Sequence, residues 1–383
     1  MKNKFSKVYI VAITVLITAV LCFMTSSAYY NGKLIIKPGS NVKLNTVTGI
    51  LEDYYYGEYD KDKATDSAVK AYVNSLGDPY TEYMNKEELN EFNSVINSSY
   101  CGIGVTVQNN IGDNTILVVG VFENSPAAGA GIEPGDIITK VDGTEYKGEQ
   151  LEEATGNIQG EEGTDVVVTI LKKSTGKEVD LTITRHNIKV ESVKSQILDD
   201  NIGYMSISQF SVDTGKEFSE QLDSLTEQGI KGLIVDVRNN GGGVTTAVEA
   251  VADCLLSKDD LIYYTCDKNG KKKYVYSKFD GVTDVPIIIL ANGNSASASE
   301  ILIGSIKDNE RGKIVGEKSY GKGVVQQLIP MTDGTAVKVT VEKYFTPSGN
   351  YIHEKGIEPD YEVKFTEYDT TDVQLEKALE LLK

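Results

Sequence analysis

From residue 190 onward, short apolar runs alternate with stretches of helical periodicity, and this alternation constrains the fold more than any other feature. The predicted strands are 202–207, 232–237, 286–290 and 337–341, and the predicted helices are 213–228, 244–256 and 297–307. Such alternation is typical of a layered α/β core, because the helices cover the faces of the sheet that the strands form. The apolar spacing of residues 372–383 predicts a final amphipathic helix.

Two further regions precede this core. Residues 96–188 contain Val- and Ile-rich runs separated by Gly, Asn and Asp turns, which predicts a compact, mostly β module with one helix near 150–158. Residues 29–95 are rich in Tyr, Glu, Asp and Lys, with apolar residues at helical spacing, which predicts a small helical section. We therefore expect an α/β (α+β) multidomain chain, with its core in residues 189–383.

The first 28 residues differ from the rest of the chain. Three lysines precede the uncharged stretch "VYIVAITVLITAVLCFMTSSA" at residues 8–28. As a helix this stretch would be about 30 Å long, enough to cross a bilayer. Positive charge before it places the N-terminus inside and the body of the chain outside the cytoplasm, as a single-pass protein of the cell membrane. Ser26 and Ala28 also fit a cleavage site, so a secreted product of signal-peptide removal is the alternative.

Charge and cysteine content exclude other classes. A net charge of −18 argues against nucleic acid as a partner. The only basic cluster, residues 271–273, is expected in a solvated loop. Cys22, Cys101, Cys254 and Cys266 are widely spaced and accompanied by only two histidines, so no metal site is expected. Free thiols are favoured, and a Cys254–Cys266 disulfide stays open.

The β module carries a recognisable loop. Its segments "YCGIGV" and "NSPAAGAGIEPGDIITKVDG" resemble a PDZ domain of the bacterial type. In Gly102, Ile103, Gly104 and Val105, bare backbone N–H groups can approach a carboxylate, and a strand edge open for pairing follows. We expect an extended peptide with a free C-terminus to dock there as an added strand.

Three alternate serines mark the junction between an apolar run and a predicted helix. Ser295, Ser297 and Ser299 lie in "ANGNSASASEI", where helix-terminal N–H groups and the helix dipole would stabilise negative charge at a nucleophile. Serine is also a favoured helix cap, so one of the three could merely start the helix.

A nucleophilic serine needs a base, and the chain offers few. His186 fits a surface or linker role, and His353 lacks an acidic partner at a telling spacing. A lysine kept neutral by burial is the alternative. Lys322 lies in "SYGKGVVQQ", where strand periodicity places Gln326 on the same face and lets it orient the amine.

Four motifs follow one another along the chain: "VDVRNNGGG", "NSASASEI", "YGKGVVQQ" and "YFTPSGNYIHEKGIEPD". Together they resemble the carboxy-terminal processing (tail-specific) proteases from about residue 45 to the C-terminus. That family comprises extracytoplasmic serine endopeptidases with an inserted PDZ domain, a Ser-Lys dyad and no cofactor. The resemblance implies Ser297 as nucleophile, Lys322, 25 positions later, as base, and Gln326 as the residue that holds the lysine. It places the oxyanion between the backbone N–H groups of Ala298 and Gly242.

The resemblance also implies polypeptide substrates with free C-termini. Gly241 stands where proline is common. Gln159 stands where many relatives carry an arginine that, in some members, couples peptide binding to assembly of the active site. Asp236 and Arg238 are expected to form a structural pair.

Two alternative functional hypotheses stay open: a PDZ-bearing scaffold without activity, and catalysis by His353 in place of Lys322. Homodimerisation through residues 45–95 and 370–383 is an alternative to packing of these ends on the core.

Overall fold

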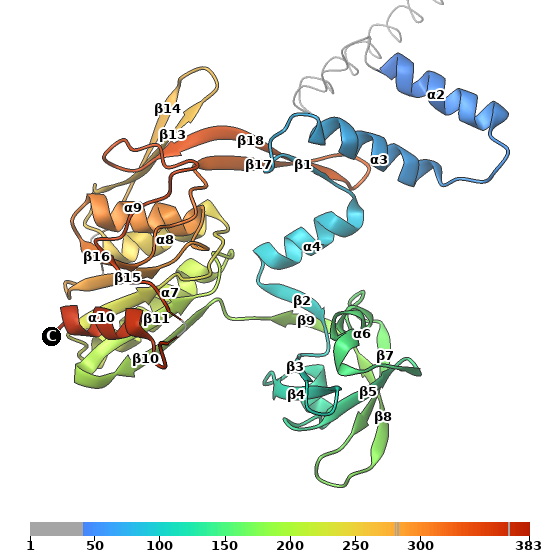
Figure 1. Ribbon diagram of the computed structural model, residues 1–383, viewed down its shortest axis with the longest axis horizontal. Coiled ribbons are helices and arrows are strands. Elements are labelled where there is room, and N and C mark those ends of the chain that lie inside the picture. The colour runs from blue at the N-terminus through green and yellow to red at the C-terminus, as the bar shows by residue number, and fades with distance from the viewer. Residues whose placement is uncertain (1–40, 280, 282, 367) are drawn as a thin grey trace, which may run out of the picture. The chain divides into compact units, whose positions relative to one another are not determined.

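Figure 1 shows a computed structural model, which describes residues 41–279, 281, 283–366 and 368–383. The chain divides into a unit that ends at Thr65 and a second unit that begins at Asp66. The expected membrane segment at 8–28, with Cys22, lies outside the described residues. Within the described residues, no helix is both long enough and apolar enough to cross a bilayer.

The predicted helical section contains three helices: α2 (Asn41–Tyr54), α3 (Lys61–Asn74) and α4 (Lys86–Ile96). The start of α4 is fixed by a capping box. The Asn85 side chain accepts the Glu88 N–H at 2.8 Å, and the Glu88 carboxylate accepts the Asn85 N–H at 3.1 Å. Between α3 and α4 lies a short strand, β1 (Glu82–Met84), which the sequence did not reveal.

The β module has a hydrophobic core of its own. Strand β2 (Ser99–Gly102) pairs with β9 (His186–Lys189) and brings the two ends of the module together. The main sheet has the order β3-β4-β5-β7-β8. Its bounds are β3 Val105–Asn110, β4 Thr115–Val121, β5 Ile137–Val141, β7 Asp165–Leu171 and β8 Glu178–Thr184, with helix α6 at Leu151–Ile158. Strand β3 is at the sheet edge, so one side of it is open to pairing.

The remaining sequence forms a layered α/β core, as predicted. Its six-stranded sheet has the order β10-β11-β12-β15-β16-β19. The strands are β10 Val193–Leu198, β11 Ile202–Ile207, β12 Gly232–Asp236, β15 Ile287–Ala291, β16 Gly312–Gly316 and β19 Tyr361–Glu362. Strands β11, β12, β15, β16 and β19 run parallel to one another, and β10 pairs antiparallel with β11.

Helices cover both faces of this sheet (Figure 1). Helices α7 (Thr214–Glu227), α8 (Thr245–Leu255) and α9 (Ala298–Asp308) bury one face, and α10 (Val373–Leu381) buries the other. Because side chains alternate along a strand, Leu233 and Val235 pack under the three helices whereas Ile234 packs toward α10. Burial on both faces explains the nearly continuous apolar runs.

A second sheet flanks the core and was largely missed by the sequence analysis. It consists of β1, β18 (Ala336–Phe345), β13 (Leu261–Asp267) and β14 (Lys272–Tyr276), and β17 (Val324–Pro330) also pairs with β18. The basic cluster at 271–273 was expected in a loop, but its last two lysines begin β14. Lysines on an exposed edge strand disfavour pairing with another chain, and they also interrupt the apolar pattern by which a strand is predicted from sequence. Cys254 and Cys266 are both free thiols, so the disulfide that was left open does not form.

Candidate active site

Ser297 lies between the end of β15 and the first residue of α9. Its backbone has φ 55° and ψ −114°, a region that a residue with a side chain rarely adopts. Two hydrogen bonds hold this conformation: the Ser297 N–H donates to the Glu300 carboxylate at 2.9 Å, and the Tyr344 hydroxyl donates to the Ser297 carbonyl at 3.1 Å. Such strain persists only where the surroundings enforce it, and it is concentrated at functional sites.

The two neighbouring serines brace this turn. Both are fully buried. The Ser295 hydroxyl donates to the Val237 carbonyl at 2.8 Å, and the Ser299 hydroxyl donates to the Asn240 carbonyl at 2.9 Å. They therefore tie the start of α9 to the loop that follows β12, while Ser297 lines a cavity.

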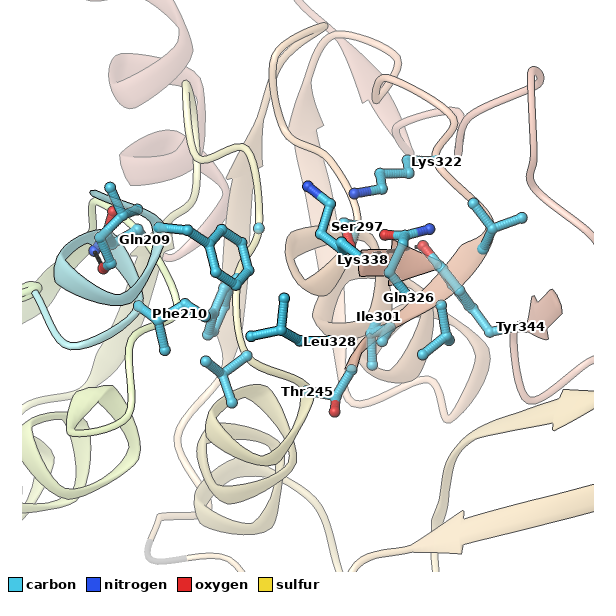
Figure 2. A pocket seen from close by; sticks show the side chains of 18 residues that line it. Gln209, Phe210, Thr245, Ser297, Ile301, Lys322, Gln326, Leu328, Lys338 and Tyr344 are labelled. Atoms are coloured by element: carbon cyan, nitrogen blue, oxygen red, sulfur yellow. Dashed lines mark hydrogen bonds between the residues drawn. The ribbon is translucent and has the colours of Figure 1, made fainter. Parts of the chain in front are cut away.

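That cavity has a volume of about 340 Å³ and an apolar wall. Figure 2 shows the side chains of Lys322, Lys338 and Gln326 extending into it near Ser297. The apolar wall comes from helices and strands that are distant in sequence: Phe92, Val95, Ile96, Phe210, Val244, Ile301, Val324, Val325, Leu328 and Tyr344. The structure thus brings Ser297, Lys322 and Gln326 to one site.

A buried carboxylate joins the two polypeptide segments of this site. Glu300 is fully buried, and its Oε2 accepts the N–H of Ser297 at 2.9 Å and the N–H of Lys322 at 2.8 Å. Its Oε1 accepts the Ser319 hydroxyl and the Gly321 N–H, both at 2.6 Å. The sequence analysis did not identify Glu300. The signal was present, because Ser297 and Glu300 form the S-x-x-E spacing of a capping box.

The amine of Lys322 lies in a partly desolvated position. Its Nζ is 4.9 Å from the centre of the Tyr80 ring. Burial lowers the pKa of Lys322, since the charged form loses water, and the positive charge of Lys338 lowers the pKa further. Three carboxylates oppose this shift without reversing it: Glu82, Asp78 and Glu300. The amine is therefore easier to deprotonate than an ordinary lysine.

Gln326 and His353 flank Lys322 differently. The Gln326 side-chain N–H donates to the Thr340 hydroxyl at 3.3 Å. A bulge between Val325 and Gln326 breaks strict alternation, and Val325 also reaches the cavity. His353 accepts the Gly323 N–H at 3.3 Å through Nδ1 and does not line the cavity.

Gly242 approaches Ser297 closely. Its φ is +104°, and a Cβ placed there would lie 2.7 Å from the Ser297 Cβ and 3.0 Å from the Ala298 nitrogen. Its N–H donates to the Asn240 side-chain oxygen at 2.9 Å. Ala298, as the first helical residue, has one of the N–H groups that a helix leaves without an internal partner. The structure thus places both expected oxyanion donors beside Ser297, with that of Gly242 engaged by Asn240.

The loop expected to bind peptide lies at the edge of the β module. Ile103, Gly104 and Val105 line a cavity of about 360 Å³ between β3 and α6, together with Gln159. Gly104 has φ +84°, and a Cβ there would lie 2.3 Å from the Ser125 Cβ, so glycine is required. Gly102 does not line this cavity and instead pairs with His186 in the β2–β9 ladder. Ile103 is fully buried, and its backbone carbonyl accepts the Ala127 N–H at 2.8 Å.

The remaining expectations concern charge. The predicted Asp236–Arg238 pair is present at 2.6 Å, and Arg238 also binds Asp372 at 2.8 Å, next to the start of α10. Among the described residues, no group of three or more His, Cys, Asp or Glu side chains could hold a metal ion.

Known protein families match this chain over both its α/β core and its β module. Residues 201–363 match the peptidase family S41, and residues 100–192 match the PDZ domain. The carboxy-terminal processing protease CtpA of Bacillus subtilis is 35% identical over 96% of this chain and 79% of CtpA. CtpB of the same organism is 34% identical over 88% of this chain and 71% of CtpB. The solved photosystem II D1 C-terminal processing protease is 28% identical, with a TM-score of 0.51 and coverage of 90% of this chain and 91% of that one. The resemblance expected from the motifs is confirmed: this chain belongs to peptidase family S41 and is a serine-type carboxy-terminal processing peptidase.

Proposed function

We propose that this peptidase works outside the cytoplasm, captures polypeptides by their free C-terminus and cleaves them near that end through an acyl-enzyme on Ser297, with Lys322 as general base. The observation that carries the proposal is the shared carboxylate oxygen of Glu300, which binds the backbone N–H of both residues. Both side chains also line one cavity.

The bond changes follow from the two side chains. The neutral Lys322 amine takes the Ser297 hydroxyl proton while the serine oxygen bonds to the peptide carbonyl carbon. The resulting ammonium then gives that proton to the leaving amine as the C–N bond breaks, which leaves an ester on Ser297. Water attacks the ester, Lys322 takes the water proton, and that proton returns to the serine oxygen when the acid product leaves.

The negative oxygen formed in these steps needs donors. The Ala298 N–H is one, favoured by the positive end of the α9 dipole. The Gly242 N–H is the second. It would be shared with, or released from, Asn240, whose oxygen it meets at 2.9 Å. Gln326 would hold the lysine amine through its carbonyl oxygen.

The edge strand β3 and the Gly104 loop support C-terminal capture. An extended peptide would add to β3, and its carboxylate would reach the backbone N–H groups of the loop. A location beyond the cytoplasm rests on residues 8–28, which would anchor the enzyme in the membrane or be removed as a signal peptide.

The test of capture compares cleavage of one peptide carrying either a free or an amidated C-terminus. We expect a lower KM for the free acid, and equal rates would remove the β module from substrate recognition. The test of the dyad compares Ser297→Ala, Lys322→Ala and His353→Ala. Loss of turnover in the first two variants with the third active supports the dyad. Unchanged turnover in Ser297→Ala would make the chain a scaffold.

A further inference from the structure

A second lysine shares the active-site cavity with Lys322. Lys338 lies on β18, directly opposite Glu82 of β1 in the antiparallel ladder. Its amine forms an ion pair with the Glu82 carboxylate and lies 5.2 Å from the centre of the Phe92 ring, which belongs to α4. The Lys338 side chain is 21% exposed. Figure 2 shows it extending toward the same region as Lys322 and Ser297.

The two amines have different surroundings. The Lys338 amine is held in an ion pair by a carboxylate on the adjacent strand. The Lys322 amine faces an aromatic ring, that of Tyr80, and is partly desolvated. Two positive charges in one cavity with an apolar wall repel each other more strongly than they would in water. The amine without the adjacent carboxylate is therefore the one that gives up its proton.

We propose that Lys338, held in place by Glu82, is a positioning residue whose fixed positive charge keeps the general base Lys322 unprotonated. The proposal rests on the proposed Ser-Lys mechanism and adds the origin of the neutral lysine. Both β1 and α4 lie outside the part of the chain that matches the peptidase family. The segment before the β module would therefore contribute to the chemistry of the core.

Several charged or titratable groups face Lys322. They come from the segment before β1, from β1 itself, from α9 and from β18: Asp78, Tyr80, Glu82, Glu300 and Lys338. Of these five residues, Lys338 is the one with a positively charged side chain. Burial lowers the pKa of Lys322 most, and Lys338 contributes the next largest effect. Glu82 acts on Lys322 in the opposite direction and holds Lys338 at the same time.

The alternative is that the Glu82–Lys338 pair only joins β1 to β18. The rising limb of kcat/KM with pH separates the two roles, because its midpoint reports the pKa of the essential base in the free enzyme. Lys338→Met removes a positive charge near Lys322, so the limb moves to higher pH. Glu82→Gln removes a negative charge, so the limb moves to lower pH. Each shift is expected to be about half a pH unit, as for charges at a partly solvated site.

A purely structural pair would move neither midpoint, or both in the same direction. The double variant should return the midpoint toward that of the parent enzyme, and Lys338→Arg should keep it in place. Lys343→Met is the matched control, because Lys343 lies on the same strand with its amine 5.1 Å from the centre of the Tyr351 ring, away from the cavity lining. An unmoved midpoint in both charge variants overturns the proposal. Activity retained in Lys322→Ala would instead overturn the dyad itself, so the two failures are distinguishable.

Discussion

The carboxylate of Glu300 accepts the backbone N–H of Lys322 at 2.8 Å, within a protein interior that leaves Glu300 no exposure to solvent. The same oxygen accepts the N–H of Ser297. One buried side chain thus ties the backbone of Ser297 to that of Lys322. A negative charge buried in this way is tolerated because four donors surround it and the N-terminus of α9 favours an anion.

Replacing Glu300 tests this arrangement. Glu300→Gln turns one accepting oxygen into an NH₂ group, which cannot accept the backbone donors it would face. We expect kcat/KM to fall about a hundredfold, as when catalytic groups are displaced by an ångström. The free energy of unfolding should fall by about 1–3 kcal/mol, since buried donors lose their acceptor.

Peptide hydrolysis and urea unfolding measure the two effects. Glu310→Gln is the control, because Glu310 is exposed just beyond the same helix. Full activity in Glu300→Gln with normal stability would show that the backbone alone sets the distance between Ser297 and Lys322.

Local sequence patterns predicted the parts of this enzyme that depend on neighbours along the chain. Strand β11 was predicted at its observed bounds because both faces of the sheet are covered and most of its residues are apolar. The alternation of strands and helices likewise predicted the layered core, and turn glycines predicted the β module. The position of Ser297 at a helix start followed from the strand that precedes it.

Contacts between distant segments could not be predicted in this way. Strand β1 is three residues long and exists because it pairs with β18, and that pairing is what brings Glu82 to Lys338. No periodicity in either segment encodes the other. The hydrogen bond from the Gly242 N–H to Asn240 also depends on a loop conformation that its glycines permit but do not specify.

Two adjacent glycines provide a matched prediction for the oxyanion loop. Gly242→Ala should lower kcat about a hundredfold or more, the usual effect of losing one oxyanion donor. Its φ of +104° strains any side chain, and the new Cβ would collide with Ser297. Gly241→Ala should retain most activity, because a Cβ there meets no atom within 4 Å. Steady-state kinetics on both variants decide the matter, and equal losses would contradict a specific role for Gly242.

The link between Arg238 and Asp372 predicts how the C-terminal helix is held. The Asp372 side chain accepts the Leu375 N–H at 3.0 Å as the cap of α10 and binds the mostly buried Arg238. Asp372→Ala should therefore lower the free energy of unfolding by about 1–3 kcal/mol, through loss of the cap and of one of the two carboxylates that bind the Arg238 guanidinium. Asp372→Asn should lose less, since it can still cap the helix.

The pH dependence of this effect has a definite sign. Burial by itself would raise the pKa of Asp372, but hydrogen bonds from Arg238 and the Leu375 N–H outweigh it and lower the pKa. A carboxyl group with a lowered folded-state pKa stabilises the protein above its unfolded pKa and loses that contribution as pH falls through the folded value. The difference between the parent enzyme and Asp372→Ala in urea unfolding should shrink below about pH 4.

Lys322, unlike Asp372, is expected to lower the stability of the folded enzyme. Its pKa is lowered by burial and by Lys338, so the folded state binds fewer protons there than the unfolded state does. Stability rises with pH wherever the unfolded state binds more protons, so this lysine destabilises the fold most at low pH. The destabilisation disappears as pH rises from the folded pKa toward the ordinary lysine value of 10.5.

Lys322→Met should therefore be inactive yet more stable than the parent enzyme at pH 7. That advantage should shrink near pH 10, whereas Lys343→Met should show neither change. Equal or lower stability of Lys322→Met at pH 7 would mean that the amine is solvated in the folded enzyme, contrary to its proposed role as a neutral base.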